Sequence, residues 1–207
     1  MKNKLKIFTL FLALFIIISL FVYQNNFLSQ QEIKIINAVQ SYLKNIPLDI
    51  AKFITYFGHE RNWQIMVVIA ITTLLLNKKF KELILYILAF PCVDFCFSFA
   101  KDIILRPRPP VNLHLITVGN TSYPSGHSSI SMVTYGLLIY FVCKYVRNKI
   151  LRITLVSLLS TLILLVGFSR VWIGVHFPTD VLGGYCLGIC IVTIFAIINE
   201  IKITSKK

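Results

Sequence analysis

Three short segments of this 207-residue chain carry side chains that could together handle a phosphoryl group. They supply three cations, two imidazoles, one carboxylate and a Ser-Gly turn. Cations neutralise phosphate oxygens, one imidazole can attack phosphorus, and the other can protonate the leaving group. The segments are Lys101-(six residues)-Arg108-Pro109, Pro124-Ser125-Gly126-His127, and Ser169-Arg170-(five residues)-His176-(three residues)-Asp180.

The tetrapeptide Pro124-Ser125-Gly126-His127 directly precedes an apolar run and predicts the start of a helix. Ser125 is a good N-cap residue, and the backbone N–H groups that follow it have no helical acceptor. Gly126 allows an anion to approach these N–H groups closely, so Ser125 and Gly126 are candidate phosphate ligands. A plain capped helix, in which His127 is incidental, is the alternative interpretation.

Residues 176–180 (HFPTD) lead into another apolar run, and the Pro-Thr pair places His176 just outside the expected helix. Asp180 is close enough to hydrogen-bond one imidazole nitrogen, which would leave the other as a nucleophile. A metal site is the rival interpretation of this spacing. The sequence offers only His127 as a third ligand and no acidic cluster, so we expect no metal.

Lys101, Arg108 and Arg170 are the candidate phosphate-binding cations. Each could instead be an ordinary anchor, because Lys and Arg at the ends of membrane spans extend to lipid headgroups. Two features favour phosphate binding: all three fall on the outer side of the topology predicted below, and prolines stiffen the chain on both sides of Arg108. An arginine guanidinium also binds phosphate oxygens in pairs.

The composition is that of an integral membrane protein. Hydrophobic residues make up 57% of the chain and charged residues 14%, with a mean hydropathy of +0.77, whereas a soluble domain carries about 25% charged residues. The first apolar run lacks a small-residue cleavage site, so we expect it to be retained as a span. Six runs, the second of them short, are candidate spans: residues 7–23, 63–76, 80–100, 127–146, 153–168 and 181–199.

Lysine and arginine residues predict the orientation. They cluster before the first run, between the second and third, between the fourth and fifth, and after the sixth, and these segments share one side if there are six spans. The positive-inside rule makes that side cytoplasmic. We therefore predict one all-α domain over residues 1–207, a polytopic six-transmembrane-helix bundle with both termini cytoplasmic and with its motif core, residues 101–180, reaching the outer face. The net charge of +13 fits this topology, and we expect no nucleic-acid partner.

Residues 31–53 differ from the six runs because apolar positions recur there at helical spacing among polar ones. Ile36, Val39 and Leu43 share a face, with Lys34 and Lys44 among the polar residues. The pattern predicts an amphipathic helix in the outer membrane interface. It could flank a substrate entrance or be an ordinary connector.

The three motifs resemble the signature of the type 2 phosphatidic acid phosphatase superfamily of membrane lipid phosphatases, K-x6-RP, PSGH and SR-x5-H-x3-D. Every signature position is matched in order between Lys101 and Asp180, and the six-span layout extends the likeness over most of the chain. All three motifs together are far more specific than PSGH alone. The resemblance implies a membrane enzyme that hydrolyses a phosphomonoester or diphosphate of a lipid.

The resemblance also implies a role for each residue. His176 would attack phosphorus to form a phosphohistidine, with Asp180 orienting it, and His127 would protonate the leaving group. Water would then hydrolyse the intermediate with neither metal nor cofactor, which agrees with cations numerous enough to neutralise phosphate. The phosphoryl oxygens would be held by Lys101, Arg108, Ser125, Gly126 and Arg170.

A lipid phosphate in the outer leaflet is the substrate class that an outward-facing membrane site favours. The small, Lys-, Ile- and Asn-rich chain suggests a multi-pass protein of the bacterial inner (cytoplasmic) membrane, with its site facing the periplasm or cell exterior. Bacterial members of this family include phosphatases of undecaprenyl diphosphate, phosphatidylglycerophosphate and lipid A. We expect undecaprenyl diphosphate or a broad range of lipid phosphates, because a phosphate leaving group needs less help than an alkoxide.

Two alternatives come from other classes of protein, and no oligomeric state is indicated. One is a non-catalytic lipid-phosphate binding or transport protein, against which both histidines and Asp180 count. The other is a vanadate-dependent haloperoxidase, a class that shares this pocket but is soluble and larger, so the six apolar runs argue against it.

Overall fold

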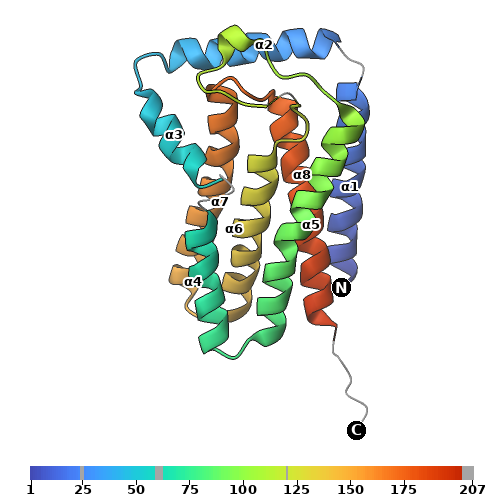
Figure 1. Cartoon of the computed structure of the whole chain (residues 1–207). Coiled ribbons are helices and arrows are strands. Elements are labelled where there is room, and N and C mark those ends of the chain that lie inside the picture. Colours follow the sequence, from blue (N-terminus) through green and yellow to red (C-terminus); the bar gives the residue numbers. More distant parts are fainter. Residues whose placement is uncertain (24–25, 59–62, 120, 202–207) are drawn as a thin grey trace.

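The computed structural model describes residues 1–23, 26–58, 63–119 and 121–201. These residues form eight α-helices and one short 3₁₀ helix (η1), and no β-strand occurs among them (Figure 1). The prediction of an all-α fold is confirmed. The bounds are α1 Lys2–Tyr23, α2 Asn26–Tyr42, α3 Leu48–Tyr56, α4 Trp63–Leu76, α5 Phe80–Ile104, η1 Val111–Leu113, α6 Gly126–Tyr145, α7 Lys149–Trp172 and α8 Pro178–Glu200.

Five of the helices, α1, α5, α6, α7 and α8, are long and apolar enough to cross a membrane. Each coincides with one of the predicted runs. α4 coincides with the second run, but its 14 residues are fewer than the ~20 that usually span the hydrocarbon layer. That the chain crosses the membrane six times therefore stays a prediction.

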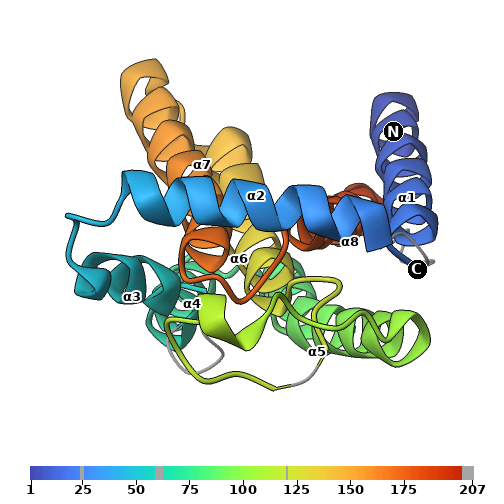
Figure 2. The same ribbon diagram turned by 90° about the horizontal axis from the view of Figure 1, so that it is seen from above.

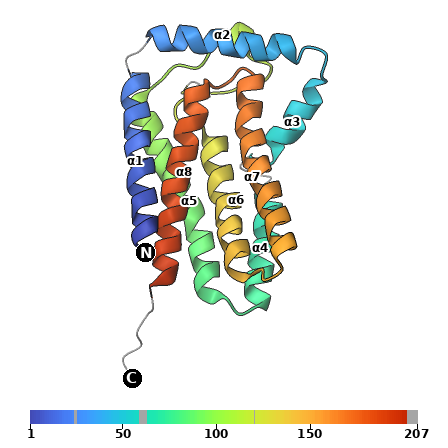
Figure 3. The ribbon, with the colours of Figure 1, turned by 180° about the vertical axis from the view of Figure 1, so that it is seen from behind.

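α8 is the helix on which most of the bundle packs. It contacts α1, α5 and α6, while α6 also packs on α7 (Figures 1 and 3). Two glycines of α8 permit the segment at the start of α6 to approach this helix closely. A Cβ atom at Gly183 would lie 2.5 Å from the Tyr123 ring, and one at Gly184 would lie 2.7 Å from the carbonyl oxygen of Ser125.

α2 lies across one end of the bundle, above the ends of α7 and α8 (Figures 1 and 2). Its Gln40 amide donates hydrogen bonds to the carbonyl oxygens of Leu113, at 2.9 Å, and Trp172, at 3.0 Å. These bonds tie the α5–α6 loop to the end of α7. α1 begins and α8 ends at the opposite end, where the α4–α5 and α6–α7 connections also lie.

The prediction of one amphipathic helix over residues 31–53 is wrong in its continuity. α2 ends at Tyr42, and α3 begins at Leu48 after a break. Pro47 is the residue before α3, and a proline cannot continue a helix because it lacks an N–H and its ring clashes with the preceding turn. The chain turns there, so that α3 packs beside α7 rather than extending α2.

The close approach of α8 to the start of α6 predicts the effect of Gly184→Ala. Alanine favours a helix over glycine by about 1 kcal/mol, but the added methyl would press on the Ser125 carbonyl, and overpacking costs about 1–3 kcal/mol. We expect the unfolding midpoint of the detergent-solubilised protein to fall by a few degrees. Gly119→Ala is the matched control, because nothing lies within 4 Å of its new Cβ. A higher midpoint in Gly184→Ala would contradict the packing described.

Candidate active site

The three sequence motifs meet at the end of the bundle that α2 covers (Figure 1). Lys101 lies in the last turn of α5 and Arg170 in the last turn of α7. Both helices therefore extend beyond the predicted runs, α5 as far as Ile104, after which the left-handed conformation of Leu105 (φ 48°) ends it. His176 lies in the turn between α7 and α8.

His176 has hydrogen-bond partners at both ring nitrogens. Its Nδ1 is 3.3 Å from Asp180 Oδ2, and its Nε2 is 3.2 Å from Arg108 Nη1. Because a guanidinium only donates, Nε2 accepts, and the ring proton is on Nδ1, where it is donated to Asp180. Burial lowers the pKa of His176 to about 3; the Asp180 carboxylate opposes this, and the charges of Arg170 and Arg108 add to it. The ring is therefore neutral at ordinary pH and carries a lone pair on Nε2.

Asp180 is completely buried, and both of its oxygens are occupied. Oδ1 accepts a hydrogen bond from Arg106 Nη1 at 2.6 Å. Oδ2 accepts from the backbone N–H of Phe177 at 2.9 Å, from the hydroxyl of Ser122 and from His176. These contacts fix the direction of the carboxylate, so the orientation of the imidazole is fixed as well.

The predicted cations Lys101, Arg108 and Arg170 differ from Arg106 in their partners. Lys101 Nζ donates to the carbonyl oxygen of Thr121 at 3.0 Å. Within the part of the chain that the structure describes, none of the three cations pairs with a carboxylate, whereas Arg106 pairs with two. Partly or fully buried cations without a counterion are costly. The arrangement therefore suits a bound anion.

Arg170 reaches the site from α7 and is held by α3. Its Nη1 donates to Thr55 Oγ1 at 2.7 Å, and the side chain is almost completely buried. Its Nε has no hydrogen-bond partner among the described residues. A buried N–H that is not otherwise satisfied can donate to a phosphate oxygen.

The PSGH segment begins α6 as predicted. Ser125 is the N-cap, and its hydroxyl accepts from the backbone N–H of Ser128 at 3.4 Å. The backbone N–H of Ser125 donates to the carbonyl oxygen of Asp180 at 3.0 Å, which joins the second motif to the third. Gly126 and His127 are the first two residues of the helix. The helix N-terminus thus adds N–H donors to the cations.

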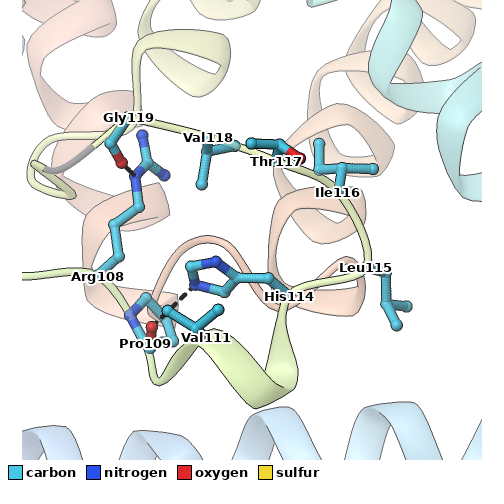
Figure 4. A pocket seen from close by; sticks show the side chains of 9 residues that line it. All are labelled: Arg108, Pro109, Val111, His114, Leu115, Ile116, Thr117, Val118 and Gly119. Atoms are coloured by element: carbon cyan, nitrogen blue, oxygen red, sulfur yellow. Dashed lines mark hydrogen bonds between the residues drawn. The ribbon is translucent and has the colours of Figure 1, made fainter.

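A cavity of about 550 Å³ opens beside Arg108 (Figure 4). Arg108 Nε donates to the carbonyl oxygen of Gly119 at 2.5 Å, and Nη1 of the same side chain donates to that of Val175 at 2.7 Å. His114 also lines the cavity, and its Nε2 donates to the carbonyl oxygen of Pro109, the residue next to Arg108, at 2.8 Å. The α5–α6 loop therefore lines an open space beside Arg108, the residue whose guanidinium contacts His176.

Four residues around the site were not identified from the sequence. Arg106 lies in the proline-rich stretch around Arg108, and nothing in the local sequence distinguishes Glu32, Thr55 or Ser122. Each acts across a large sequence separation, as in the contact between Glu32 and Arg106 at 2.6 Å. The one available signal was that Arg106 repeats the Arg-Pro pair of Arg108.

No group of three or more His, Cys, Asp or Glu side chains comes together within the described ranges. Since a protein metal site is usually built from three or four such ligands, those ranges provide no ready metal cage. Phosphate neutralisation by side chains would therefore rely on Lys101, Arg108 and Arg170.

The membrane-length helices and the histidine, carboxylate and cation site define a helical membrane phosphatase. The sequence model of the PAP2 superfamily matches residues 79–203, more than half of the chain. The chain belongs to this superfamily and is a hydrolase that acts on phosphate esters of lipids.

Known proteins similar to the chain include phosphatidylglycerophosphatase B of Bacillus subtilis, with 33% identity over 66% of this chain and 67% of the relative. Undecaprenyl-diphosphatase BcrC of the same organism is 35% identical over 44% of each chain. The crystal structure of the transmembrane PAP2-type phosphatidylglycerolphosphate phosphatase from B. subtilis superposes with a TM-score of 0.82 and 26% identity, covering 99% of this chain and 100% of the other. The apolar helices and these bacterial relatives identify a bacterial membrane protein.

Thr55→Val tests whether α3 positions a phosphate ligand. The change removes the hydroxyl that accepts from Arg170, and a hydrogen bond to a charged group contributes about 1.5–3 kcal/mol. We expect KM for a lipid phosphate to rise about tenfold or more while kcat changes less. The matched control is Thr73→Val on α4. Among the described residues, the Thr73 hydroxyl bonds only the carbonyl of Ile69 in its own helix. Equal KM values in the two variants would show that Thr55 does not support the site.

Proposed function

We propose that this protein is a metal-independent lipid phosphatase that works through a phosphohistidine at His176. The observation that carries the proposal is the hydrogen-bonded series from Asp180 through the neutral imidazole to Arg108, with Nε2 facing a cationic site. An imidazole whose proton is held on Nδ1 presents its lone pair from Nε2, which is the requirement for a nucleophile.

In the first step His176 Nε2 attacks phosphorus and the bond from phosphorus to the leaving oxygen breaks. His127 donates a proton to that oxygen, which leaves as an alcohol or as a lipid phosphate. The imidazole becomes cationic as the N–P bond forms, and the Asp180 carboxylate stabilises this charge. The phosphoryl oxygens are held by three cations, Lys101, Arg108 and Arg170. Ser125 and the backbone N–H of Gly126 at the start of α6 provide further contacts to them.

In the second step water attacks phosphorus and the N–P bond breaks. His127, which lost its proton in the first step, accepts one from the water. Inorganic phosphate leaves, and His176 returns to its neutral form with the proton on Nδ1. The step needs no further reactant, so the cycle is balanced.

We propose undecaprenyl diphosphate, or a broad range of lipid phosphates, as the substrate. The likeness to undecaprenyl-diphosphatase BcrC supports the first, although it covers less than half of the chain. The longer match to phosphatidylglycerophosphatase B favours phosphatidylglycerophosphate as the second candidate. Lipid A and a purely binding or transport role are the remaining alternatives.

The placement that we propose is a single domain over residues 1–207 in the bacterial inner membrane, with six spans and the site facing outward. The helix ends next to the basic connections gather at the end of the bundle opposite α2 (Figure 1). If that end is cytoplasmic, as the positive-inside rule requires, then α2 lies at the outer surface. The motifs would then meet lipid headgroups of the outer leaflet.

Phosphate release by purified, detergent-solubilised protein tests this function. The substrates would be undecaprenyl diphosphate, phosphatidylglycerophosphate, phosphatidic acid and lipid A, each with and without EDTA. We expect release from at least one lipid, unaffected by EDTA. His176→Ala should lower kcat by on the order of 10²–10⁴-fold or more, because the nucleophile is gone.

Two outcomes would contradict the proposal. Release that EDTA abolishes would show a metal-dependent reaction, and near-normal turnover by His176→Ala would show a different nucleophile. Silence across the panel from folded protein would favour the binding or transport alternative.

A further inference from the structure

Arg106 lies between two buried carboxylates that come from different parts of the chain. Its Nη1 donates to Asp180 Oδ1 and its Nη2 to Glu32 Oε2, each at 2.6 Å. The side chains of Arg106 and Glu32 are 2–3% exposed and that of Asp180 is completely buried. The guanidinium also lies over the ring of Phe177, 4.1 Å from its centroid. Arg106 therefore does not face the phosphate site, and it acts through Asp180.

Glu32 belongs to α2, the helix that crosses the end of the bundle (Figure 2). Its second oxygen, Oε1, accepts from the backbone N–H and from the hydroxyl of Thr179, each at 2.8 Å. Thr179 is in the first turn of α8, next to Asp180, and its hydroxyl also accepts from Arg106 at 2.8 Å. α2 is thus bonded directly to the turn that carries the catalytic carboxylate.

We propose that Arg106 and Glu32 are positioning residues for His176, and that α2 sets the basicity of the catalytic pair through them. The inference rests on the phosphohistidine function proposed above. Arg106 occupies Oδ1 of Asp180, so that only Oδ2 is directed at the imidazole. The Glu32 carboxylate neutralises part of the positive charge of Arg106. The negative charge of Asp180 is then less compensated by Arg106 and can stabilise a cationic imidazole.

Loss of the charge of Arg106 and loss of the charge of Glu32 must therefore shift the pKa of His176 in opposite directions. Removing the charge of Arg106 leaves Asp180 more negative toward the ring, which favours imidazole protonation. Removing the charge of Glu32 leaves the positive charge of Arg106 compensated by Asp180 alone, which disfavours protonation of the His176 imidazole. A purely structural role would give both variants the same kind of defect and no opposed shift.

Other charged groups near the ring do not change this sign. Asp180 faces it from α8, Arg108 from the α5–α6 loop and Arg170 from α7. Arg106 and Glu32 differ from these because they do not contact the phosphate site. Changing them alters the charge felt at Nδ1 while the phosphate-binding cations remain in place.

The test compares Arg106→Gln, Arg106→Lys and Glu32→Gln with the native full-length protein in detergent. The acid limb of the pH profile of kcat/KM should move up by about one pH unit in Arg106→Gln, since a charge this close shifts a pKa by one unit or more. It should move down, or out of the measurable range, in Glu32→Gln. Arg106→Lys should move it less than Arg106→Gln, because a lysine keeps the charge but not the fork that spans two carboxylates. We expect kcat to fall on the order of tenfold in Arg106→Gln and Glu32→Gln, because each variant loses a group that orients a reacting side chain.

Asp49→Asn is the matched control for the carboxylate-to-amide change. Asp49 is on α3, with an exposed side chain whose one ion pair within the described part of the chain is with Lys52, and its variant should keep the native profile. Shifts in the same direction in Arg106→Gln and Glu32→Gln, or no shift in either, would overturn the proposal. If Arg106→Gln does not fold, the titration midpoint of His176 in Glu32→Gln decides: a midpoint below that of the native protein supports the proposal, and an unchanged or higher one overturns it.

A second readout is independent of lipid hydrolysis. The chain has four histidines, so ¹⁵N-histidine spectra, with His176→Gln for assignment, follow the protonation of His176 directly. The titration midpoint should rise in Arg106→Gln relative to Glu32→Gln even if no lipid is hydrolysed. Opposed midpoints in an inactive protein would thus support the positioning role while the proposed function fails. Equal midpoints in a protein that hydrolyses lipid would support the proposed function and overturn the positioning role.

Discussion

The buried carboxylate of Asp180 is the interaction on which the rest of the site depends. It lies in the first turn of α8, the helix against which α1, α5 and α6 pack, so its position is set by the whole bundle. It binds the imidazole of His176 on one side and Arg106 on the other. A buried charge is tolerated only when its partners satisfy it, and here they come from the α5–α6 loop and the turn before α8. The orientation of the His176 imidazole is therefore a consequence of how the helices of the bundle pack together.

Charge is distributed unevenly around this carboxylate. Arg106 is neutralised twice, by Asp180 and Glu32, whereas Lys101, Arg108 and Arg170 have no carboxylate partner within the described residues. The first arrangement is complete without a ligand, and the second becomes balanced when a phosphate binds. This difference separates a cation that maintains geometry from cations suited to a substrate, although all four are basic residues within 70 positions of one another.

The sequence was most informative where spacing and chemistry are local. Apolar runs predicted the long helices, and the residues of the three motifs were found to lie together, because each motif is attached to a helix end. What could not be predicted depends on contacts between distant segments. Glu32 meets Thr179 only because α2 turns across the bundle, and Thr55 reaches Arg170 only because Pro47 interrupts the amphipathic stretch and directs α3 beside α7. No residue near Glu32 or Thr55 in the sequence indicates these partners.

The central claim is that His176 Nε2 forms a covalent bond to phosphorus, and trapping that bond tests it most directly. Native protein would be mixed with a ³²P-labelled lipid phosphate that it hydrolyses, quenched in alkaline detergent, digested and analysed by mass spectrometry. We predict a phosphoryl group on His176 that is stable to alkali, lost in acid, and absent from His176→Gln. Label on another residue, or turnover with no label on His176 at any quench time, would contradict the account.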